Sequence, residues 1–270
     1  MTQISSRGLL RAVPPALLIW CALAAPAVAA EGAIATRFEM FGFAGAHVLS
    51  LHSSTDASPD HYGITVDFQT MGMAAVFVDM KSHAKVNGHI VGGQPQPVEF
   101  DDDSRRNGAE RRARIDYRPG GDVAPTISPP LPNPVPTAEL RGTVDNLSAY
   151  LRLQRQLALT GRCALTVRVF DGRHAYDLAF SDLGQQDLTP TGGQNYSGKA
   201  IACRMVRRNW PNFPDPEKDE GARQGTIWYA RLVPGELLVP VRMRMDTQLG
   251  VIEGMLAELH GRGVNLMLME

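Results

Sequence analysis

The sequence predicts a mainly β protein: a single large, strongly curved antiparallel sheet, an open or half β-barrel, with one amphipathic helix packed on its concave side. Three observations lead to this prediction. Apolar and polar residues alternate along many short segments, which is typical of half-buried strands. The chain of 270 residues contains 26 Gly and 19 Pro, which favour frequent turns. Only one segment has apolar residues at clear helical spacing, and a lone amphipathic helix must bury its apolar stripe against a sheet.

The first element is a predicted secretory signal peptide at residues 1–30. Arg7 and Arg11 precede a short apolar run, and small side chains surround Ala29 and Ala30, where cleavage is expected. An N-terminal membrane anchor is the less favoured alternative, because the apolar run is short and a proline interrupts it. We therefore expect an exported, periplasmic protein that does not span a membrane once the signal peptide is removed.

Four strands are predicted before the proline-rich part of the chain. They contain the alternating runs at residues 38–40, 64–69, 74–80 and 114–117. Between the last two runs, acidic and basic side chains mix over residues 101–112. Such a charge run is usually solvated, so we expect a hairpin loop there in preference to an anion site or a nucleic-acid site.

A proline-rich segment, residues 119–137, divides the predicted strands into two groups. It contains seven of the 19 prolines. We therefore expect extended polyproline II conformation, and neither a helix nor a central strand. The segment could separate two domains. Because both flanks have the same alternating pattern, we favour a single β-rich domain over residues 31–270, in which the segment is an internal crossover.

The predicted helix follows this crossover. Asp145 is a favourable N-cap, and Gly161 can end the helix. Arg152 and Arg155 are expected on its exposed side. If the helix covers the concave side of the sheet as a lid, the candidate lid residues are Leu147, Tyr150, Leu151 and Leu157.

A hairpin is predicted at residues 171–172, because Asp-Gly between alternating runs favours a two-residue turn. Pairing outward from this turn places Val169 opposite His174. The pairing sorts apolar side chains onto one face of the hairpin, and Cys163 lies on that face.

Further strands are expected in the runs at residues 199–207, 227–229, 239–245, 251–259 and 264–269. Alternation in the first of these runs turns Cys203 toward the interior. Cys163 and Cys203 are the two cysteines that would remain after cleavage of the signal peptide. An even number of cysteines in an oxidising compartment favours a disulfide between them, with two buried free thiols as the alternative.

Five short motifs follow the pattern of a known family: GTVDNLSA at 142–149, VFDGR at 169–173, YDL at 176–178, YSGKAIAC at 196–203 and WYA at 228–230. With their surroundings they resemble the bacterial envelope family catalogued as domain of unknown function 3108, over nearly the whole mature chain. The resemblance implies a periplasmic protein with no established activity, similar in fold to the lipoprotein carrier and acceptor group, LolA and LolB. That group has a half-barrel around an apolar cavity that a helix partly closes.

The inward-facing positions of the predicted sheet are rich in aliphatic and methionine side chains, which adapt to irregular spaces. They enclose either an ordinary core or a cavity for an acyl chain, and the cavity interpretation rests on the resemblance. The candidate cavity-lining residues are Leu165, Val167, Val169, Tyr176, Leu178, Ile201, Met205, Val241, Met243 and Met245.

Motifs for catalysis or cofactor binding are not found in the sequence. The seven histidines form no H-x-H or H-E-x-x-H motif, and neither a G-x-S-x-G motif nor a phosphate-binding glycine loop occurs. We therefore expect no metal site and no cofactor. The formal net charge of −1 provides no basic field that would recruit nucleic acid.

Three functions remain open. The first is a non-enzymatic periplasmic binding protein for a lipid, a lipidated ligand or another apolar ligand, in cell-envelope maintenance. The second is a structural or interaction protein of the envelope, with a solid core and an envelope protein as partner. The third and least favoured is a hydrolase, which needs a polar cluster in the concavity that could include His174 or Asp177. The hairpin pairing already turns Asp177 outward.

Overall fold

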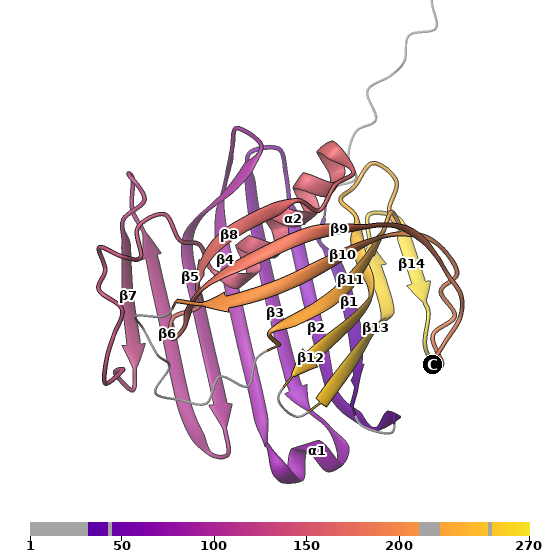
Figure 1. Ribbon diagram of the computed structural model, residues 1–270, viewed down its shortest axis with the longest axis horizontal. Helices are drawn as coiled ribbons and strands as arrows, with labels where there is room; N and C mark the ends of the chain where they lie inside the picture. Colours follow the sequence, from indigo (N-terminus) through magenta and orange to yellow (C-terminus); the bar gives the residue numbers. More distant parts are fainter. Residues whose placement is uncertain (1–31, 43–44, 211–221, 248–249) are drawn as a thin grey trace, which may run out of the picture.

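The computed structural model describes residues 32–42, 45–210, 222–247 and 250–270 (Figure 1). The predicted signal peptide therefore lies outside the described residues. Within them, no helix is both long enough and apolar enough to cross a membrane.

One antiparallel sheet contains the fourteen strands of the described chain. The first seven are β1 (Ile34–Phe41), β2 (His47–Ala57), β3 (His61–Thr70), β4 (Met80–Val91), β5 (Gln94–Arg106), β6 (Ala109–Tyr117) and β7 (Val123–Ser128). The others are β8 (Leu165–Phe170), β9 (Ala175–Leu188), β10 (Gly198–Asn209), β11 (Gln224–Ala230), β12 (Val239–Thr247), β13 (Gly250–Gly261) and β14 (Val264–Met267). The helices are α1 (Gly72–Phe77) and α2 (Asn146–Thr160).

The spatial order of the strands is β7-β6-β5-β4-β3-β2-β1-β13-β12-β11-β10-β9-β8, and β14 pairs with β13 beside this path. The sheet is not closed, because the path ends at β7 on one side and at β8 on the other. In Figure 1, β8–β12 lie in front of β2–β5, and α2 lies between these two layers. The predicted fold class, an open and curved antiparallel sheet with one amphipathic helix on its concave side, is confirmed.

The alternation of buried and exposed residues along the strands places apolar side chains in the core. In β4, every second residue from Ser82 to Ile90 is buried, and the residues between them are exposed. Most of the large buried side chains of β8–β12 belong to one apolar cluster, and those of β3–β6 belong to a second. Each half of the curved sheet thus presents an apolar concave face, and the two faces meet around α2.

The helix α2 begins and ends where the sequence predicts. The Asp145 side chain accepts a hydrogen bond from the backbone N–H of Ser148 at 2.8 Å, and Gly161 ends the helix in the left-handed conformation, with φ 68°. Leu151 packs into the β3–β6 cluster, and Leu153 into the β8–β12 cluster. The helix is therefore buried on two sides.

The expected exposure of Arg152 and Arg155 is wrong. Both side chains are half-buried on the turn between β4 and β5. Arg152 donates to the carbonyl oxygen of Pro95 at 3.0 and 3.1 Å, and Arg155 donates to that of Gly93 at 2.7 Å. The two guanidinium groups give these carbonyl oxygens side-chain hydrogen-bond donors and fix α2 to the hairpin.

The predicted hairpin exists, but its register differs from the prediction by two residues. Phe170 pairs with Ala175, and Val169 pairs with Tyr176 instead of His174. The turn is longer than predicted because the Asp171 carboxylate accepts the backbone N–H groups of residues 173 and 174, at 3.0 and 2.8 Å. A shift of two residues leaves every side chain on its predicted face.

The strand predicted at residues 74–80 is wrong. Residues Gly72–Phe77 form α1, and β4 begins only at Met80. The chain enters this helix through Gly72 with φ +54°, and Met and Ala both have high helix propensity. The run is too short for its alternation to distinguish a strand from one turn of helix.

The charged residues 101–112 are not a loop. They extend β5 and β6, which are joined at Asn107 and Gly108. The charged side chains are accommodated in strands because those on the outer face pair across the ladder, as Asp103 does with Arg112 at 3.0 Å.

Part of the proline-rich segment is a strand. Val123–Ser128 forms β7, an edge strand, and polyproline II conformation is therefore wrong for these residues. An edge position tolerates Pro125, because the ladder there needs hydrogen bonds on one side only. Beyond β7 the chain returns toward α2, and Val135 and Leu140 are buried in the β3–β6 cluster.

Candidate functional site

The predicted cavity-lining residues lie in the packed interior. Val167, Val169, Tyr176, Leu178, Met205, Val241 and Met245 are buried, and Leu165, Ile201 and Met243 are half-buried. Nine of the ten belong to or pack against the β8–β12 cluster, and Val241 belongs to a neighbouring cluster with residues of β1 and β13. None of them lines the mouth pocket described below.

The predicted lid residues are part of the same packing. Leu151 and Leu157 are 1% and 2% exposed, and Leu147 packs against the β3–β6 cluster. The ring of Tyr150 lies edge-on to that of Phe180, with centroids 5.9 Å apart. Burial raises the pKa of the Tyr150 hydroxyl to about 12. The helix fills the concavity of the described chain instead of covering an empty one.

Leu153 is the lid residue that the sequence analysis missed. It is 0% exposed and packs into the β8–β12 cluster together with Ala149. Leu153 lies at the edge of the predicted stripe, one turn before Leu157, and both pack into the β8–β12 cluster, whereas Leu151 packs into the β3–β6 cluster. The width of this apolar surface was the available signal that α2 is buried on two sides.

A mouth pocket of about 760 Å³ lies at the C-terminal end of α2, between the helix and the ends of the sheet. Five charged residues are part of its wall: Asp56, Arg155, Arg231, Glu236 and Arg262. Ala57, Ala158 and Leu237 supply apolar surface. Arg262 is held by an ion pair with Glu236 and donates to the carbonyl oxygen of Ala57 at 2.8 Å.

A buried polar group anchors the start of α2. The Ser148 hydroxyl donates to Asp145 at 2.6 Å and lies 2.7 Å from the Tyr62 hydroxyl of β3. Asp145 and Ser148 are both 0% exposed. Burial raises the pKa of the Asp145 carboxyl, while the hydrogen bonds from the side chain and backbone of Ser148 oppose the shift. Burial likewise raises the pKa of Tyr62. The motif at 142–149 is thus a structural anchor between helix and sheet.

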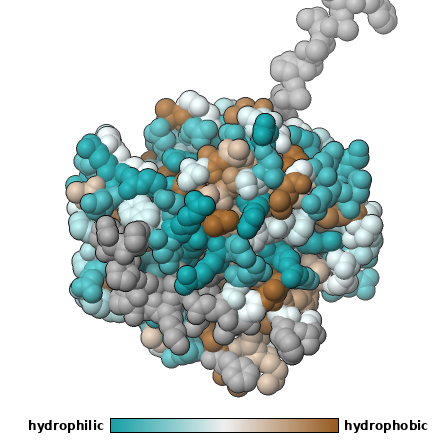
Figure 2. All heavy atoms as spheres, viewed as in Figure 1, coloured by the Kyte–Doolittle hydropathy of each residue, from teal (hydrophilic) through white to brown (hydrophobic). Residues whose placement is uncertain are grey.

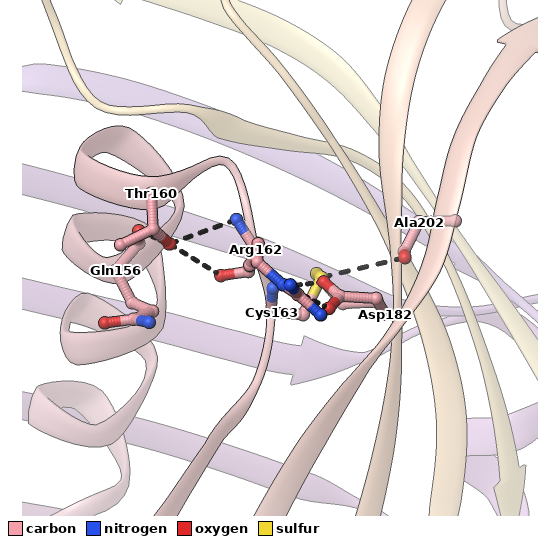
Figure 3. The surroundings of a disulfide bond; sticks show 7 residues. Gln156, Thr160, Arg162, Cys163, Asp182 and Ala202 are labelled. Carbon is pink, nitrogen blue, oxygen red and sulfur yellow. Dashed lines mark hydrogen bonds and ion pairs between the residues drawn. A yellow bond between two sulfur atoms is a disulfide. The ribbon is translucent and has the colours of Figure 1, made fainter.

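Cys163 and Cys203 form the predicted disulfide, which is confirmed, with their Cα atoms 5.6 Å apart. Both cysteines are 0% exposed. Figure 3 shows that the bridge lies at the end of α2, where Asp182 of β9 pairs with Arg162 at 3.2 Å. Asp182 also accepts the backbone N–H of Cys163 at 2.5 Å. The end of the helix is therefore tied covalently to β10.

The two residues considered for hydrolysis have structural contacts. His174 Nδ1 lies 3.2 Å from Asp171, whose carboxylate also accepts two backbone N–H groups of the turn. Burial alone would raise the pKa of Asp171, but the hydrogen bonds and charge of His174 lower it. Asp177 accepts a hydrogen bond from the Trp210 indole at 3.0 Å, away from His174. The structure does not bring His174 and Asp177 together as one site.

A second carboxyl lies inside the sheet near this turn. Asp102 of β5 accepts hydrogen bonds from Ser82 at 2.6 Å and Ser104 at 3.1 Å. Burial raises the pKa of Asp102, and the negative charge of Asp171 contributes to the increase. Among the described residues, no group of three or more His, Cys, Asp or Glu is arranged to hold a metal ion.

The fold and its interior define a class of protein: a mainly β chain on one open sheet, with its own helix packed in the concavity. The chain belongs to the family described as protein of unknown function, DUF3108, whose family model matches residues 37–257. No curated protein matches the chain.

Two solved structures are similar to this chain. One is a β-barrel-like protein of the domain of unknown function DUF1849 from Brucella abortus, with a TM-score of 0.48 and 11% identity over 84% of this chain and 96% of that one. The other is described as a "putative lipoprotein" from Parabacteroides distasonis, with a TM-score of 0.30 and 10% identity over 86% of this chain and 96% of that one.

Proposed function

We propose that this protein is a non-enzymatic component of the bacterial cell envelope that acts through its outer surface. The position of α2 carries the proposal. Leu151 on one side of the helix and Leu153 and Leu157 on the other are at most 2% exposed between the two halves of the sheet. The periplasmic location rests on the predicted signal peptide, and the resemblance to LolA and LolB supports it as an analogy.

An acyl chain could enter the concavity only by displacing these three leucines. Exposing a buried leucine costs about 2 kcal/mol, so opening the interior costs about 6 kcal/mol. A penalty of this size weakens binding by about 10⁴-fold. The filled interior therefore favours the interaction protein over the carrier of an internal lipid.

The mouth pocket supports a second candidate function, the binding of an apolar or lipidated ligand. Its volume of about 760 Å³ lies in the range of small-molecule sites, and Ala57, Ala158 and Leu237 provide an apolar surface. A ligand with an anionic group would meet Arg155 and Arg231 there.

A titration of delipidated protein with a fluorescent fatty acid separates the two functions. We expect no saturable binding at micromolar concentrations, because the concavity is filled. Saturable binding that is abolished by Ala158→Trp, which fills the mouth pocket without entering the core, would establish the second function. Saturable binding that persists in Ala158→Trp would place the ligand inside the sheet and refute the proposal.

A further inference from the structure

The connection between β3 and β4 is an exposed apolar tip. Residues 71–78, Met-Gly-Met-Ala-Ala-Val-Phe-Val, include no charged or hydroxyl-bearing side chain. Met71, Met73 and Val76 are 36%, 67% and 73% exposed. Figure 1 shows α1 protruding at the lower end of the molecule, and Figure 2 shows brown and pale brown atoms at this end beneath a largely hydrophilic face. We call residues 71–78 the apolar tip.

Backbone hydrogen bonds hold the tip in place. The N–H of Met71 donates to the carbonyl oxygen of Val48 at 2.9 Å, and the N–H of Met80 donates to the Thr70 hydroxyl at 2.9 Å. Of the side chains described at residues 71–76, none belongs to a buried apolar cluster. Met73 and Val76 can therefore enter another apolar phase without any change in the sheet.

Basic residues lie directly beside the tip, on the hairpin of β5 and β6. Asn107 in its turn donates its backbone N–H to the carbonyl oxygen of Asp79 at 2.7 Å, and its side chain accepts the N–H of Asp79 at 2.9 Å. We define the basic rim as the charged residues at this end of β4, β5 and β6. Its members are Lys81, Arg105, Arg106, Arg111 and Arg112, with the acidic Asp79, Asp103 and Glu110.

The rim has five basic and three acidic side chains and therefore a net charge of +2, whereas the whole chain has a net charge of −1. Lys81 and Arg105 face each other across the ladder of β4 and β5. Together with Arg112 they line a hollow of about 460 Å³ on the surface, whose wall also contains Asp103 and Glu110. Arg105 pairs with Asp79 at 3.4 Å and Arg112 with Asp103 at 3.0 Å, so the net charge of +2 is what remains after these ion pairs. Positive charge is thus concentrated where the exposed apolar side chains are.

We propose that the apolar tip and the basic rim bind the surface of an anionic phospholipid bilayer. Met73 and Val76 enter the boundary between headgroups and acyl chains, and the rim contacts the phosphate groups. The combination of protruding apolar side chains with neighbouring basic ones suits this boundary, which is apolar on one side and negatively charged on the other. The inference rests on the proposed function, since it names the partner of the outer surface.

The expected strength of vesicle binding follows from two contributions, the insertion of apolar side chains and the attraction of basic side chains to the lipid phosphates. Met73 and Val76, the two most exposed of the side chains described in the tip, should each contribute roughly tenfold to the partition coefficient. Each lysine or arginine near an anionic surface should contribute roughly fivefold, and less as salt screens the charges.

Cosedimentation of the mature protein with vesicles tests the inference. One set of vesicles contains equal amounts of phosphatidylglycerol and phosphatidylcholine, and the other contains phosphatidylcholine alone. Met73→Asp/Val76→Asp removes the apolar contribution, and Lys81→Gln/Arg112→Gln reduces the charge. The matched control is Leu159→Asp/Met267→Asp, which changes side chains that are 70% and 58% exposed elsewhere on the surface. Circular dichroism and thermal unfolding verify that each variant is folded.

We expect the wild-type protein to bind the anionic vesicles. The tip variant should bind them about 100-fold or more weakly and the charge variant about 25-fold more weakly, whereas the control should bind like wild type. The inference would be overturned if wild type did not bind at millimolar lipid, or if the tip variant bound as well as the control. It would also be overturned if a protein partner bound the tip while vesicles did not. Such a failure leaves the fatty-acid titration unaffected, so it is distinguishable from failure of the proposed function.

Discussion

Replacing both bridging cysteines, Cys163→Ala/Cys203→Ala, should lower the free energy of unfolding by about 4 kcal/mol. The disulfide closes a loop with a sequence separation of 40, which contains β8, β9 and the start of β10. Without it the unfolded chain gains the entropy of this loop. Alanine also removes the two buried sulfur atoms, so the loss of their packing adds to the decrease. Urea unfolding, followed by tryptophan fluorescence, measures the change.

Reduction of the wild-type protein serves as the control for this prediction. Oxidised wild type should unfold at a higher urea concentration than the reduced protein, and the double variant should behave like the reduced protein under both conditions. Equal midpoints for oxidised and reduced wild type would contradict the prediction, as would two titratable thiols in the unfolded but unreduced protein.

Asp145→Ala should lower the free energy of unfolding by about 3 kcal/mol. The substitution removes the acceptor of two hydrogen bonds from Ser148, from its backbone N–H at 2.8 Å and from its hydroxyl at 2.6 Å. Ser148 is 0% exposed, so water does not replace the lost acceptor without a change in packing. Urea unfolding at pH 7 measures the loss, and a decrease below 1 kcal/mol would contradict the assigned anchor.

Asp145→Asn is the matched control, because an amide retains an acceptor for the backbone N–H and does not titrate. Burial raises the pKa of Asp145 in the folded state, so the folded protein binds this proton more tightly than the unfolded chain does. The stability that Asp145 contributes is fully present below its pKa in the unfolded chain, about 4, and is lost as the pH rises through its pKa in the folded protein. Wild type should therefore become less stable relative to Asp145→Asn as the pH increases from 4 to 7.

The sequence was sufficient to predict features with a local cause. Asp145 and Gly161 mark the ends of α2 because their side-chain and backbone properties suit helix ends. The inward faces of the hairpin strands and the inward direction of Cys163 and Cys203 follow from a period of two residues. These properties are determined by a residue and its close neighbours in the chain.

Features that depend on distant parts of the chain were not predicted. The strands β2, β5 and β7 were missed because charged, polar or proline residues interrupt their alternation, and partners across the ladder stabilise them. The burial of Leu153 depends on a second half of the sheet that closes over α2. The hairpin register depends on the Asp171 carboxylate, whose hydrogen bonds lengthen the turn. Whether the concavity is filled or empty is a question of packing, which alternation does not decide.

Native mass spectrometry of the protein purified from the periplasm after a high-salt wash determines whether the interior of the sheet holds a ligand besides α2. The salt wash removes lipid held at the basic rim but not lipid buried inside the sheet. We expect the mass of the cleaved polypeptide with one disulfide and no adduct, and no stoichiometric acyl lipid in an organic extract. A stoichiometric lipid adduct that survives the wash in both wild type and Ala158→Trp would show that the concavity holds a ligand, and would refute a filled interior.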